Sequence, residues 1–356
     1  MKKIGLIGLG GIANGVHIPG IRKSKDLELA AICDIKPDVL EKTGRALDIP
    51  EDHRFSDYRD LIACPDVEVV DVATPNRVHA EIAIAALRAG KPTICEKPLA
   101  MDAAEAERVA EAANAAGLPG SVCFSYRFRA AARFARDIVR RGDIGRVYHV
   151  SIQYLQGWGL PSANCPLVWR FVKSETGSGA LGDLGSHAAD LVEFVTGQAC
   201  RRVVAHCGTE VTERERLDDR SKKGPVDVDD YTNFMAALDG GASACFQITR
   251  LAFGRGNYQR MEVYGEKGSL VYMLDENGSG ADTLEICMGE AMRSGFTYSR
   301  IAIPERYRAD QMQCIADAIA GDAHGLVATF RDGADNMHIM DAVLRSAQTG
   351  RWEDVV

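Results

Sequence analysis

Residues 2–13 read KKIGLIGLGGIA, a short apolar run that leads directly into the glycine pattern G-x-G-x-x-A. The run predicts a β-strand, and the segment after the pattern predicts a helix. In such a unit Gly8 permits a tight turn, Gly10 lets the backbone approach a pyrophosphate, and Ala13 keeps the helix close to the sheet. The N–H groups at the helix N-terminus then meet the anion. This stretch therefore predicts the first βα unit of a dinucleotide-binding domain.

Further apolar, β-branched runs follow the first one and alternate with helical patterns. The strand-like runs cover residues 27–34, 68–74, 92–97 and 121–125, and the helical patterns cover residues 78–89 and 103–116. Continuous apolar strands that alternate with helices indicate a parallel sheet covered on both faces. The first third of the chain is therefore expected to be a doubly wound α/β domain of the Rossmann type.

Asp34 ends the second of these strands, where a carboxylate would hydrogen-bond the ribose hydroxyls of an adenosine. A carboxylate at this place repels a 2′-phosphate, so NAD is the expected cofactor rather than NADP. Lys36 lies two residues later and softens this preference.

Polar residues follow the later strands of this sheet. Ligands of open α/β sheets bind outside the carboxyl ends of the strands, so these side chains are expected at one edge, beside the glycine turn and around a nicotinamide. For His79 the alternative is a local hydrogen bond in the first turn of its helix. The expected cofactor-binding residues are Gly8, Gly10, Gly11, Ile12, Asp34, Thr74, Asn76, His79, Glu96 and Lys97.

The composition limits the classes of function. The chain has 356 residues and a formal net charge of −8, which disfavours a nucleic-acid partner. No apolar run reaches the ~18 residues of a membrane span. The ten cysteines form no Cys-x-x-Cys pair, which fits a reducing cytoplasm better than a secreted disulfide protein. Cys and His lack ligand spacing, so no metal site is expected.

The pattern changes after about residue 122. Alternating runs with the glycine turns DGGA and GEKGS predict antiparallel strands at residues 146–155, 231–251 and 260–274. The charged segment 212–227 is expected to be a surface loop. The domains are therefore expected at residues 1–122 and 123–356.

A second motif, GALGDLGSHAADL, occupies residues 179–191. If a helix starts here, Asp183, His187 and Asp190 share one face, because positions i, i+4 and i+7 stack. Such a polar stripe faces either water or a cleft in which a proton moves.

This motif, together with GLGGIA and with ATPNRVHAEIAIAALRAGKPTICEKPLA at residues 73–100, resembles the Gfo/Idh/MocA oxidoreductases, relatives of glucose-fructose oxidoreductase and inositol dehydrogenase. The tail FRDGADNMHIMDAVLRSAQTGRWEDV at residues 330–355 extends the resemblance. The resemblance implies an N-terminal Rossmann domain and a C-terminal α/β domain with a large, mostly antiparallel sheet, through which subunits form homodimers or homotetramers. It also implies NAD(P)-dependent hydride transfer at a carbinol of a sugar, inositol or related polyol.

In the family pattern Lys97 matches the lysine of the E-K-P motif, while Asp183 and His187 match an aspartate and a histidine. Oxidation of an alcohol removes a hydride from carbon and a proton from oxygen. His187 is the expected base because imidazole titrates near neutral pH, and Asp183 is expected to orient it. Lys97 is expected to stabilise the developing alkoxide, and the sequence leaves open which of Lys97 and His187 takes the proton first. Asp190 is expected to be structural.

A substrate cleft is expected between the two domains. Aromatic faces beside hydrogen-bonding groups suit a polyhydroxylated ring, although such residues also pack in cores. The expected substrate residues are Arg127, Tyr154, Gln156, Trp169 and Arg170, with Trp158 beside them. Two other functions remain open: an NAD-assisted glycosidase without net redox change, and a dinucleotide-binding sensor without catalysis.

Overall fold

The computed structural model describes residues 1–276, 281–292, 294–322 and 324–356. The described chain forms two compact units, Met1–Ser125 with Ala309–Met337 and Tyr126–Arg308 with His338–Val356. The first boundary lies close to the expected one after residue 122. Residues 309–337, however, belong to the first unit, whereas the sequence-based boundaries assign them to the second domain. The domain prediction is wrong for this segment, because a division into two consecutive stretches cannot describe a chain that returns to its first unit.

The first unit contains a seven-stranded sheet in the order β17-β6-β5-β4-β1-β2-β3. Strands β1 to β6 pair in parallel, and the edge strand β17 runs antiparallel to β6. The strands are β1 (Lys2–Ile7), β2 (Leu27–Cys33), β3 (Arg54–Phe55), β4 (Val69–Val72), β5 (Thr93–Cys95), β6 (Gly120–Val122) and β17 (Ala328–Thr329). This order confirms the expected doubly wound sheet. The strand order reverses between the neighbouring strands β1 and β4, which marks the switch point at which such sheets bind ligands.

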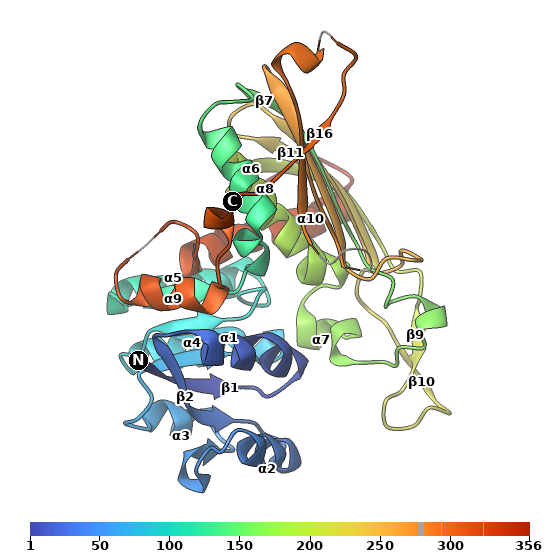
Figure 1. Ribbon diagram of the computed structural model, residues 1–356. Helices are drawn as coiled ribbons and strands as arrows, with labels where there is room; N and C mark the ends of the chain where they lie inside the picture. Colours follow the sequence, from blue (N-terminus) through green and yellow to red (C-terminus); the bar gives the residue numbers. More distant parts are fainter. Residues whose placement is uncertain (277–280, 293, 323) are drawn as a thin grey trace. The chain divides into compact units, whose positions relative to one another are not determined.

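Helices accompany this sheet (Figure 1). Local signals explain where several begin: Asp57, Asp102 and Asp310 accept backbone N–H groups at the starts of α3, α5 and α9, as N-caps do. Gly117 ends α5 in the left-handed conformation that favours glycine. The helical elements are η1 (Ala13–His17), α1 (Ile18–Lys23), α2 (Pro37–Ala46), η2 (Glu51–His53), α3 (Tyr58–Ala63), η3 (Asn76–Val78), α4 (His79–Arg88), α5 (Ala103–Ala116), α9 (Gln311–Ile319) and α10 (Phe330–Thr349), of which α10 belongs to this unit up to Met337.

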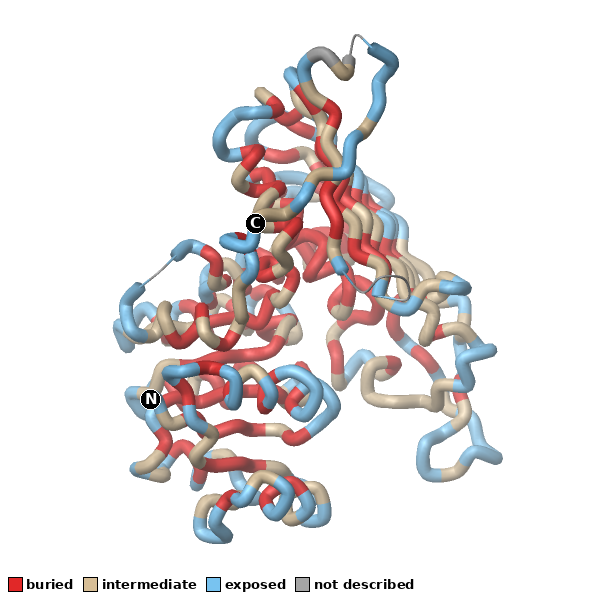
Figure 2. The backbone as a smooth tube through the Cα atoms, in the orientation of Figure 1, coloured by how far each residue is buried: buried red, intermediate tan, exposed pale blue. Residues whose placement is uncertain are grey.

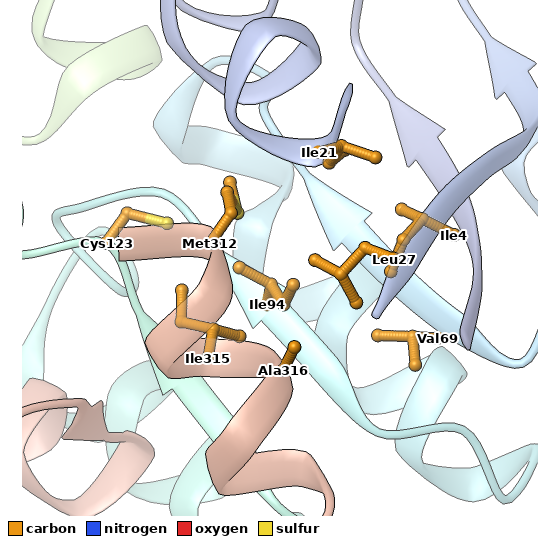
Figure 3. Close-up of a cluster of buried hydrophobic side chains, with 9 residues drawn as sticks. All are labelled: Ile4, Ile21, Leu27, Val69, Ile94, Cys123, Met312, Ile315 and Ala316. Carbon is orange, nitrogen blue, oxygen red and sulfur yellow. The ribbon is translucent and has the colours of Figure 1, made fainter. Parts of the chain in front are cut away.

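One core cluster explains why residues 309–337 return to this unit (Figure 3). Met312 and Ile315 of α9 pack with Ile4, Val69 and Ile94 of β1, β4 and β5, and each of these side chains is at most 2% exposed. Burial of apolar surface contributes about 25 cal/mol per Å². The apolar face of α9 therefore completes the core of the Rossmann sheet.

The second unit contains a nine-stranded sheet in the order β16-β15-β14-β13-β7-β12-β11-β8-β18. Only the described pair β7–β12 is parallel, and the other pairs are antiparallel. The strands are β7 (Val147–Leu155), β8 (Cys200–Gly208), β11 (Tyr231–Leu238), β12 (Ser243–Thr249), β13 (Tyr258–Gly265), β14 (Gly268–Asp275), β15 (Thr283–Met288), β16 (Ser299–Ile301) and β18 (Glu353–Asp354). Buried and exposed residues alternate along the central strands (Figure 2). The large, mostly antiparallel sheet is confirmed.

The second unit also holds short helices and a small ribbon. Residues 212–227, expected to be a surface loop, contain strands β9 (Glu213–Glu215) and β10 (Lys223–Pro225), which pair antiparallel. The helical elements are η4 (Ser125–Phe128), α6 (Ala130–Arg140), η5 (Pro161–Ala163), η6 (Trp169–Phe171), α7 (Lys173–Thr176), η7 (Leu181–Gly185), α8 (Ser186–Thr196), η8 (Gly289–Met292), η9 (Glu305–Tyr307) and the remainder of α10. Of the helices in the described ranges, none is long and apolar enough to cross a membrane.

Candidate functional site

The glycine turn after β1 leaves its backbone accessible. Gly8 has a φ of 90°, and a Cβ atom built on it would lie 2.6 Å from the carbonyl oxygen of Ala73, so a larger residue does not fit there. A Cβ atom on Gly10 or Gly11 meets no heavy atom of the described chain within 4 Å. Ile12 follows, 38% exposed, at the start of the helical turn η1. The turn is therefore packed closely against Ala73 at Gly8, and it leaves the backbone at Gly10 and Gly11 accessible, as binding of a pyrophosphate requires.

Asp34, directly after β2, is tied to this turn. Its Oδ2 accepts the N–H of Leu9 at 2.9 Å, and its Oδ1 accepts the N–H of Lys36 at 2.9 Å. The carboxylate thus braces the glycine turn and presents negative charge beside it. This arrangement fits the ribose hydroxyls of NAD and opposes the phosphate of NADP.

Thr74 and Asn76 follow β4. The Cγ2 atom of Thr74 would lie 3.0 Å from a Cβ on Gly8, so this side chain adjoins the glycine turn. Its Oγ1 is buried and has no hydrogen-bond partner in the described part of the chain. A buried hydroxyl of this kind is costly unless it meets a polar group. Together with the open glycine backbone, it fits a bound dinucleotide at this edge.

Both ring nitrogens of His79 face backbone carbonyl oxygens. Its ring is 1% exposed, with Nδ1 2.8 Å from the carbonyl oxygen of Pro98 and Nε2 2.9 Å from that of Thr74. Burial lowers the pKa of His79 despite these carbonyl groups, which favour the charged ring. The imidazole therefore links the turns after β4 and β5, and its contact with Pro98 joins segments 19 residues apart rather than residues within its own helix.

Glu96 also braces the site. Its Oε1 lies 2.9 Å from Nε2 of His17, and its Oε2 accepts the N–H of Lys97 at 3.1 Å. The opposite ring nitrogen of His17 lies 2.8 Å from Oδ2 of Asp71 on β4. Burial alone would raise the pKa of Glu96, but the hydrogen bond and charge of His17 and the charge of Lys97 lower it. Lys97 follows this buried cluster, half-buried, with a cis peptide bond to Pro98.

In the second unit, Asp183 lies on the π-helical turn η7 and His187 in the first turn of α8. The Oδ2 of Asp183 accepts a hydrogen bond from Nη2 of Arg250 at 3.3 Å, and Nε of Arg170 lies 3.9 Å from its Oδ1. Arg250 is fully buried and also donates to the carbonyl oxygens of Arg170 and Gly179. Sequence reasoning missed Arg250, because an arginine at the end of a strand carries no pattern that signals burial.

Asp229 supports the same turn. It accepts the N–H groups of Gly179 at 2.6 Å and Leu181 at 2.7 Å, so its carboxylate binds the start of η7. A Cβ on Gly179 would overlap the Asp229 carbonyl oxygen. The glycine thus permits a close backbone approach.

His187 is 6% exposed and lies against two tyrosines. The ring of Tyr126 meets it edge-on, with centroids 4.7 Å apart, and the centroid of the Tyr154 ring lies 6.2 Å away. The two phenol oxygens are 2.5 Å apart, and Asn257 hydrogen-bonds Tyr126. Burial raises the pKa of both tyrosines, so both remain neutral hydroxyls.

Gln156 extends this network. Its Nε2 donates to the Tyr154 hydroxyl at 3.3 Å and to Oδ1 of Asn257 at 3.1 Å, and its Oε1 accepts from Nε1 of Trp158 at 2.6 Å. Trp169 and Arg170 open η6, where the guanidinium lies 4.3 Å from the centre of the indole. The expected substrate residues Tyr154 and Gln156 thus belong to one network, and Arg170 lies beside Asp183.

Arg127 has a different environment from the one expected. Its guanidinium forms a buried forked pair with Asp190, in which Nε lies 2.9 Å from Oδ2 and Nη2 lies 2.5 Å from Oδ1. The two charges compensate each other in the interior, and the substrate contact expected of Arg127 stays a prediction. Asp190 is structural as expected, but it pairs across 63 residues of sequence rather than within its helix.

Comparisons with known proteins agree with this geometry. Residues 2–124 match the oxidoreductase family with an NAD-binding Rossmann fold, and residues 132–271 match the GFO/IDH/MocA C-terminal domain. The chain is 34% identical over 353 residues to levoglucosan dehydrogenase of Pseudarthrobacter phenanthrenivorans, covering 91% of this chain and 88% of that protein. It is 28% identical to myo-inositol 2-dehydrogenase of Thermotoga maritima, covering 78% and 79%.

Solved structures show the same similarity over the full length. Levoglucosan dehydrogenase in complex with NADH and levoglucosan has a TM-score of 0.86 at 30% identity, covering 100% of this chain and 99% of the other. An oxidoreductase domain protein from Kribbella flavida has a TM-score of 0.88 at 34% identity, with both chains fully covered. With its Rossmann sheet, open glycine turn and ribose-side aspartate, the chain belongs to the Gfo/Idh/MocA family of NAD-binding oxidoreductases.

Proposed function

We propose that this protein is an NAD-dependent dehydrogenase that oxidises a secondary carbinol of an uncharged cyclic sugar, with anhydrosugars such as levoglucosan as the preferred class. The hydrogen-bonded network beside His187 carries this proposal. Its members are all uncharged hydroxyl, amide or indole groups: Tyr126, Tyr154, Gln156, Trp158 and Asn257. Aromatic faces with adjacent hydrogen-bonding groups suit a neutral ring with several hydroxyls. The 34% identity to levoglucosan dehydrogenase supports the same class.

We assign the reaction to Lys97, Asp183 and His187. Bound NAD⁺ supplies a nicotinamide that accepts the hydride. His187 takes the hydroxyl proton, and Asp183, held by Arg250, orients the imidazole and stabilises its charged form. Lys97 donates a hydrogen bond to the same oxygen and stabilises its developing negative charge.

The remaining assignments divide into cofactor and substrate residues. Gly8, Gly10, Gly11 and Ile12 hold the pyrophosphate, Asp34 the ribose, and Thr74 and Asn76 the nicotinamide half, while Glu96 and His79 brace the turns that carry these groups. Tyr154, Gln156, Trp169 and Arg170 contact the sugar.

The exposed face of the large sheet supports association of copies. Along it, Met235 of β11 pairs with Cys245 of β12, which pairs with Ser151 of β7. All three side chains are exposed and uncharged, and Gln153 and Gln247 hydrogen-bond each other on neighbouring strands. We propose that the protein is a homodimer or homotetramer through this face. The ten free thiols support a cytoplasmic location.

The test is a substrate panel with the purified protein. Levoglucosan, myo-inositol, methyl glucosides, free aldoses and glucose 6-phosphate are each incubated with NAD⁺ or NADP⁺, and the absorbance of reduced nicotinamide is followed. We expect NADH to accumulate with neutral cyclic substrates, most rapidly with levoglucosan, and little reduction of NADP⁺. Release of free sugar from a glycoside without NADH would indicate the glycosidase instead, and NADH binding without turnover of any compound would indicate the sensor.

A further inference from the structure

A histidine outside the assigned reaction lies in the interior of the first unit between two carboxylates. His17, the last residue of η1, is 0% exposed. Its Nδ1 lies 2.8 Å from Oδ2 of Asp71, and its Nε2 lies 2.9 Å from Oε1 of Glu96. A carboxylate only accepts hydrogen bonds, so this geometry suits a ring in which both nitrogens donate, an imidazolium.

The surroundings agree with this charge. Burial alone would lower the pKa of His17, but the charges and hydrogen bonds of Asp71 and Glu96 raise it to about 10. The Sγ atom of Cys123, after β6, lies within 4.8 Å of a ring nitrogen of His17 and a carboxylate oxygen of Glu96. Burial raises the pKa of this thiol, so the thiol is neutral. The charge of Lys97 also lowers the pKa of Glu96. The imidazolium is therefore the buried cation that compensates Asp71 and Glu96.

The cluster is connected directly to Lys97. One oxygen of Glu96 meets the imidazole, and the other accepts the N–H of Lys97 at 3.1 Å. The same imidazole ends a π-helical turn that starts at the glycine motif, and such turns recur at functional sites. His17 thus joins the helix that follows the glycine turn to the backbone of Lys97.

We propose that His17 is a positioning residue for Lys97: held between Asp71 and Glu96, it fixes the Glu96 carboxylate, which in turn fixes the backbone and the electrostatic environment of Lys97. This inference rests on the role assigned to Lys97 in the proposed function and adds the group that controls it.

The chain offers a matched control for this proposal. His53 also lies between two carboxylates of the first unit, with Nδ1 2.9 Å from Asp52 and Nε2 3.3 Å from Asp66. It precedes β3, and Asp66 precedes β4, so this pair lies at the amino ends of the strands, opposite the edge that carries Lys97. The variant His53→Gln removes an imidazole of the same kind without touching the Glu96 contact.

The kinetic test uses the full-length variants His17→Gln, Glu96→Gln and the double variant. In Glu96→Gln the side-chain amide loses the Lys97 N–H contact when its oxygen faces an N–H of His17, and it keeps both contacts only when Nε2 of a neutral His17 accepts from it. In either orientation the negative charge at position 96 is lost. We expect kcat to fall about 10- to 100-fold in each single variant, as for a misplaced catalytic group. We expect the Kd for NADH to stay within about threefold, and the double variant to lose little more than the worse single variant. His53→Gln should keep the wild-type kcat.

A second readout does not depend on turnover. Acetylation of Lys97 by acetic anhydride is followed by peptide mass spectrometry at fixed pH, with Lys36 as the internal reference. We expect slower acetylation in His17→Gln, because an uncompensated Glu96 carboxylate favours the ammonium form. The rate should recover in the double variant, in which the side chain at position 96 is neutral.

The outcomes separate this inference from the proposed function. A folded His17→Gln protein with wild-type kcat and wild-type Lys97 acetylation would overturn the positioning role, and so would equal losses in His53→Gln. Should His17→Gln not fold, the same two measurements on Glu96→Gln decide the matter. If the wild-type protein oxidises no compound of the panel but the acetylation pattern is as expected, the proposed function fails and the coupling of His17 to Lys97 stands.

Discussion

Lys97 and His187 have different surroundings, and these explain the roles proposed for them. Lys97 follows a buried strand and is half-buried beside the His17–Glu96 pair. His187 is almost fully buried against a tyrosine whose hydroxyl stays neutral. A cation that stabilises an alkoxide needs an anchored backbone, and a base needs a fixed ring next to the proton that it accepts.

We expect Lys97→Met and His187→Gln each to lower kcat by about 10²–10⁴, the usual contribution of a general acid or base. Because both groups are proposed to act on one proton transfer, the double variant should lose less than the product of the two effects. Steady-state kinetics with saturating NAD⁺ checks this, with NADH binding as the control for an intact fold. Turnover at the wild-type rate in either single variant would exclude that residue from catalysis.

Asp34 sets the cofactor preference through its charge. In Asp34→Asn an oxygen still accepts the N–H of Leu9, but the repulsion of a 2′-phosphate is gone. We expect the KM for NAD⁺ to rise about tenfold, equivalent to ~1.4 kcal/mol, and the KM for NADP⁺ to fall. Initial rates with both cofactors measure the change, and an unaltered ratio of the two KM values would contradict it.

Among single residues, the sequence motifs identified the polar groups but not their partners. Gly8, Gly10 and Asp34 lie where the strand–turn–helix pattern predicts them, because that pattern is local. The motifs did not reveal that Arg127 pairs with Asp190, 63 positions away in the sequence. No local periodicity reports a contact at that separation.

Two π-helical turns, η1 and η7, each carry an ionisable residue to which a role is assigned. The turn η1 ends at His17, and η7 holds Asp183 immediately before α8. Sequence spacing predicted an ordinary helix through Asp183 and His187 and could not reveal the wider turn. The buried carboxylate of Asp229, bonded to the backbone of Gly179 and Leu181, supports η7 from another segment of the chain.

His17, the last residue of η1, should make the free energy of unfolding depend on pH. The pKa of His17 is raised from 6.5 to about 10 in the folded chain, so its contribution is complete below about pH 6.5 and is lost as the pH rises through about 10. The free energy of unfolding should therefore fall more steeply between pH 7 and 10 in the wild-type protein than in His17→Gln.

Urea denaturation at a series of pH values measures this difference. Near pH 7 we expect His17→Gln to be about 3–5 kcal/mol less stable, because it leaves two buried carboxylates without their cation. The groups outside the His17–Asp71–Glu96 cluster that titrate in this range are common to both proteins, so parallel curves would contradict the assigned imidazolium.

At the scale of the whole molecule, the first unit needs two separate stretches of the chain. Residues 1–125 alone lack α9 and β17, and this leaves Ile4, Val69 and Ile94 without their cover of Met312 and Ile315 (Figure 3). We expect a fragment of residues 1–125 to aggregate or to melt at low temperature. The same fragment joined to residues 309–337 by a flexible linker should unfold cooperatively. Circular dichroism melts compare the two, and equal stability would show that α9 is dispensable.

The exposed face of the nine-stranded sheet gives the other prediction at this scale. Met235 is 48% exposed at one end of the row Met235–Cys245–Ser151, whose side chains are all uncharged. If copies associate through this face, Met235→Lys places charges in a desolvated contact and should shift the protein to monomers in sedimentation experiments. Glu28→Gln, on a strand of the first unit, raises the net charge by the same one unit and serves as the control.

The sequence by itself determined the class of the fold, the dinucleotide turn, the acidic residue that favours NAD and the family to which the chain belongs. These depend on strand and helix periods and on motifs of adjacent residues, which the physics of local backbone conformation makes readable. Only the tertiary structure decided that residues 309–337 complete the first unit, that Arg127 neutralises Asp190, and that His17 lies between Asp71 and Glu96. A buried charge is costly unless an opposite charge or a hydrogen-bonding group lies beside it, and the path of the whole chain determines which group that is.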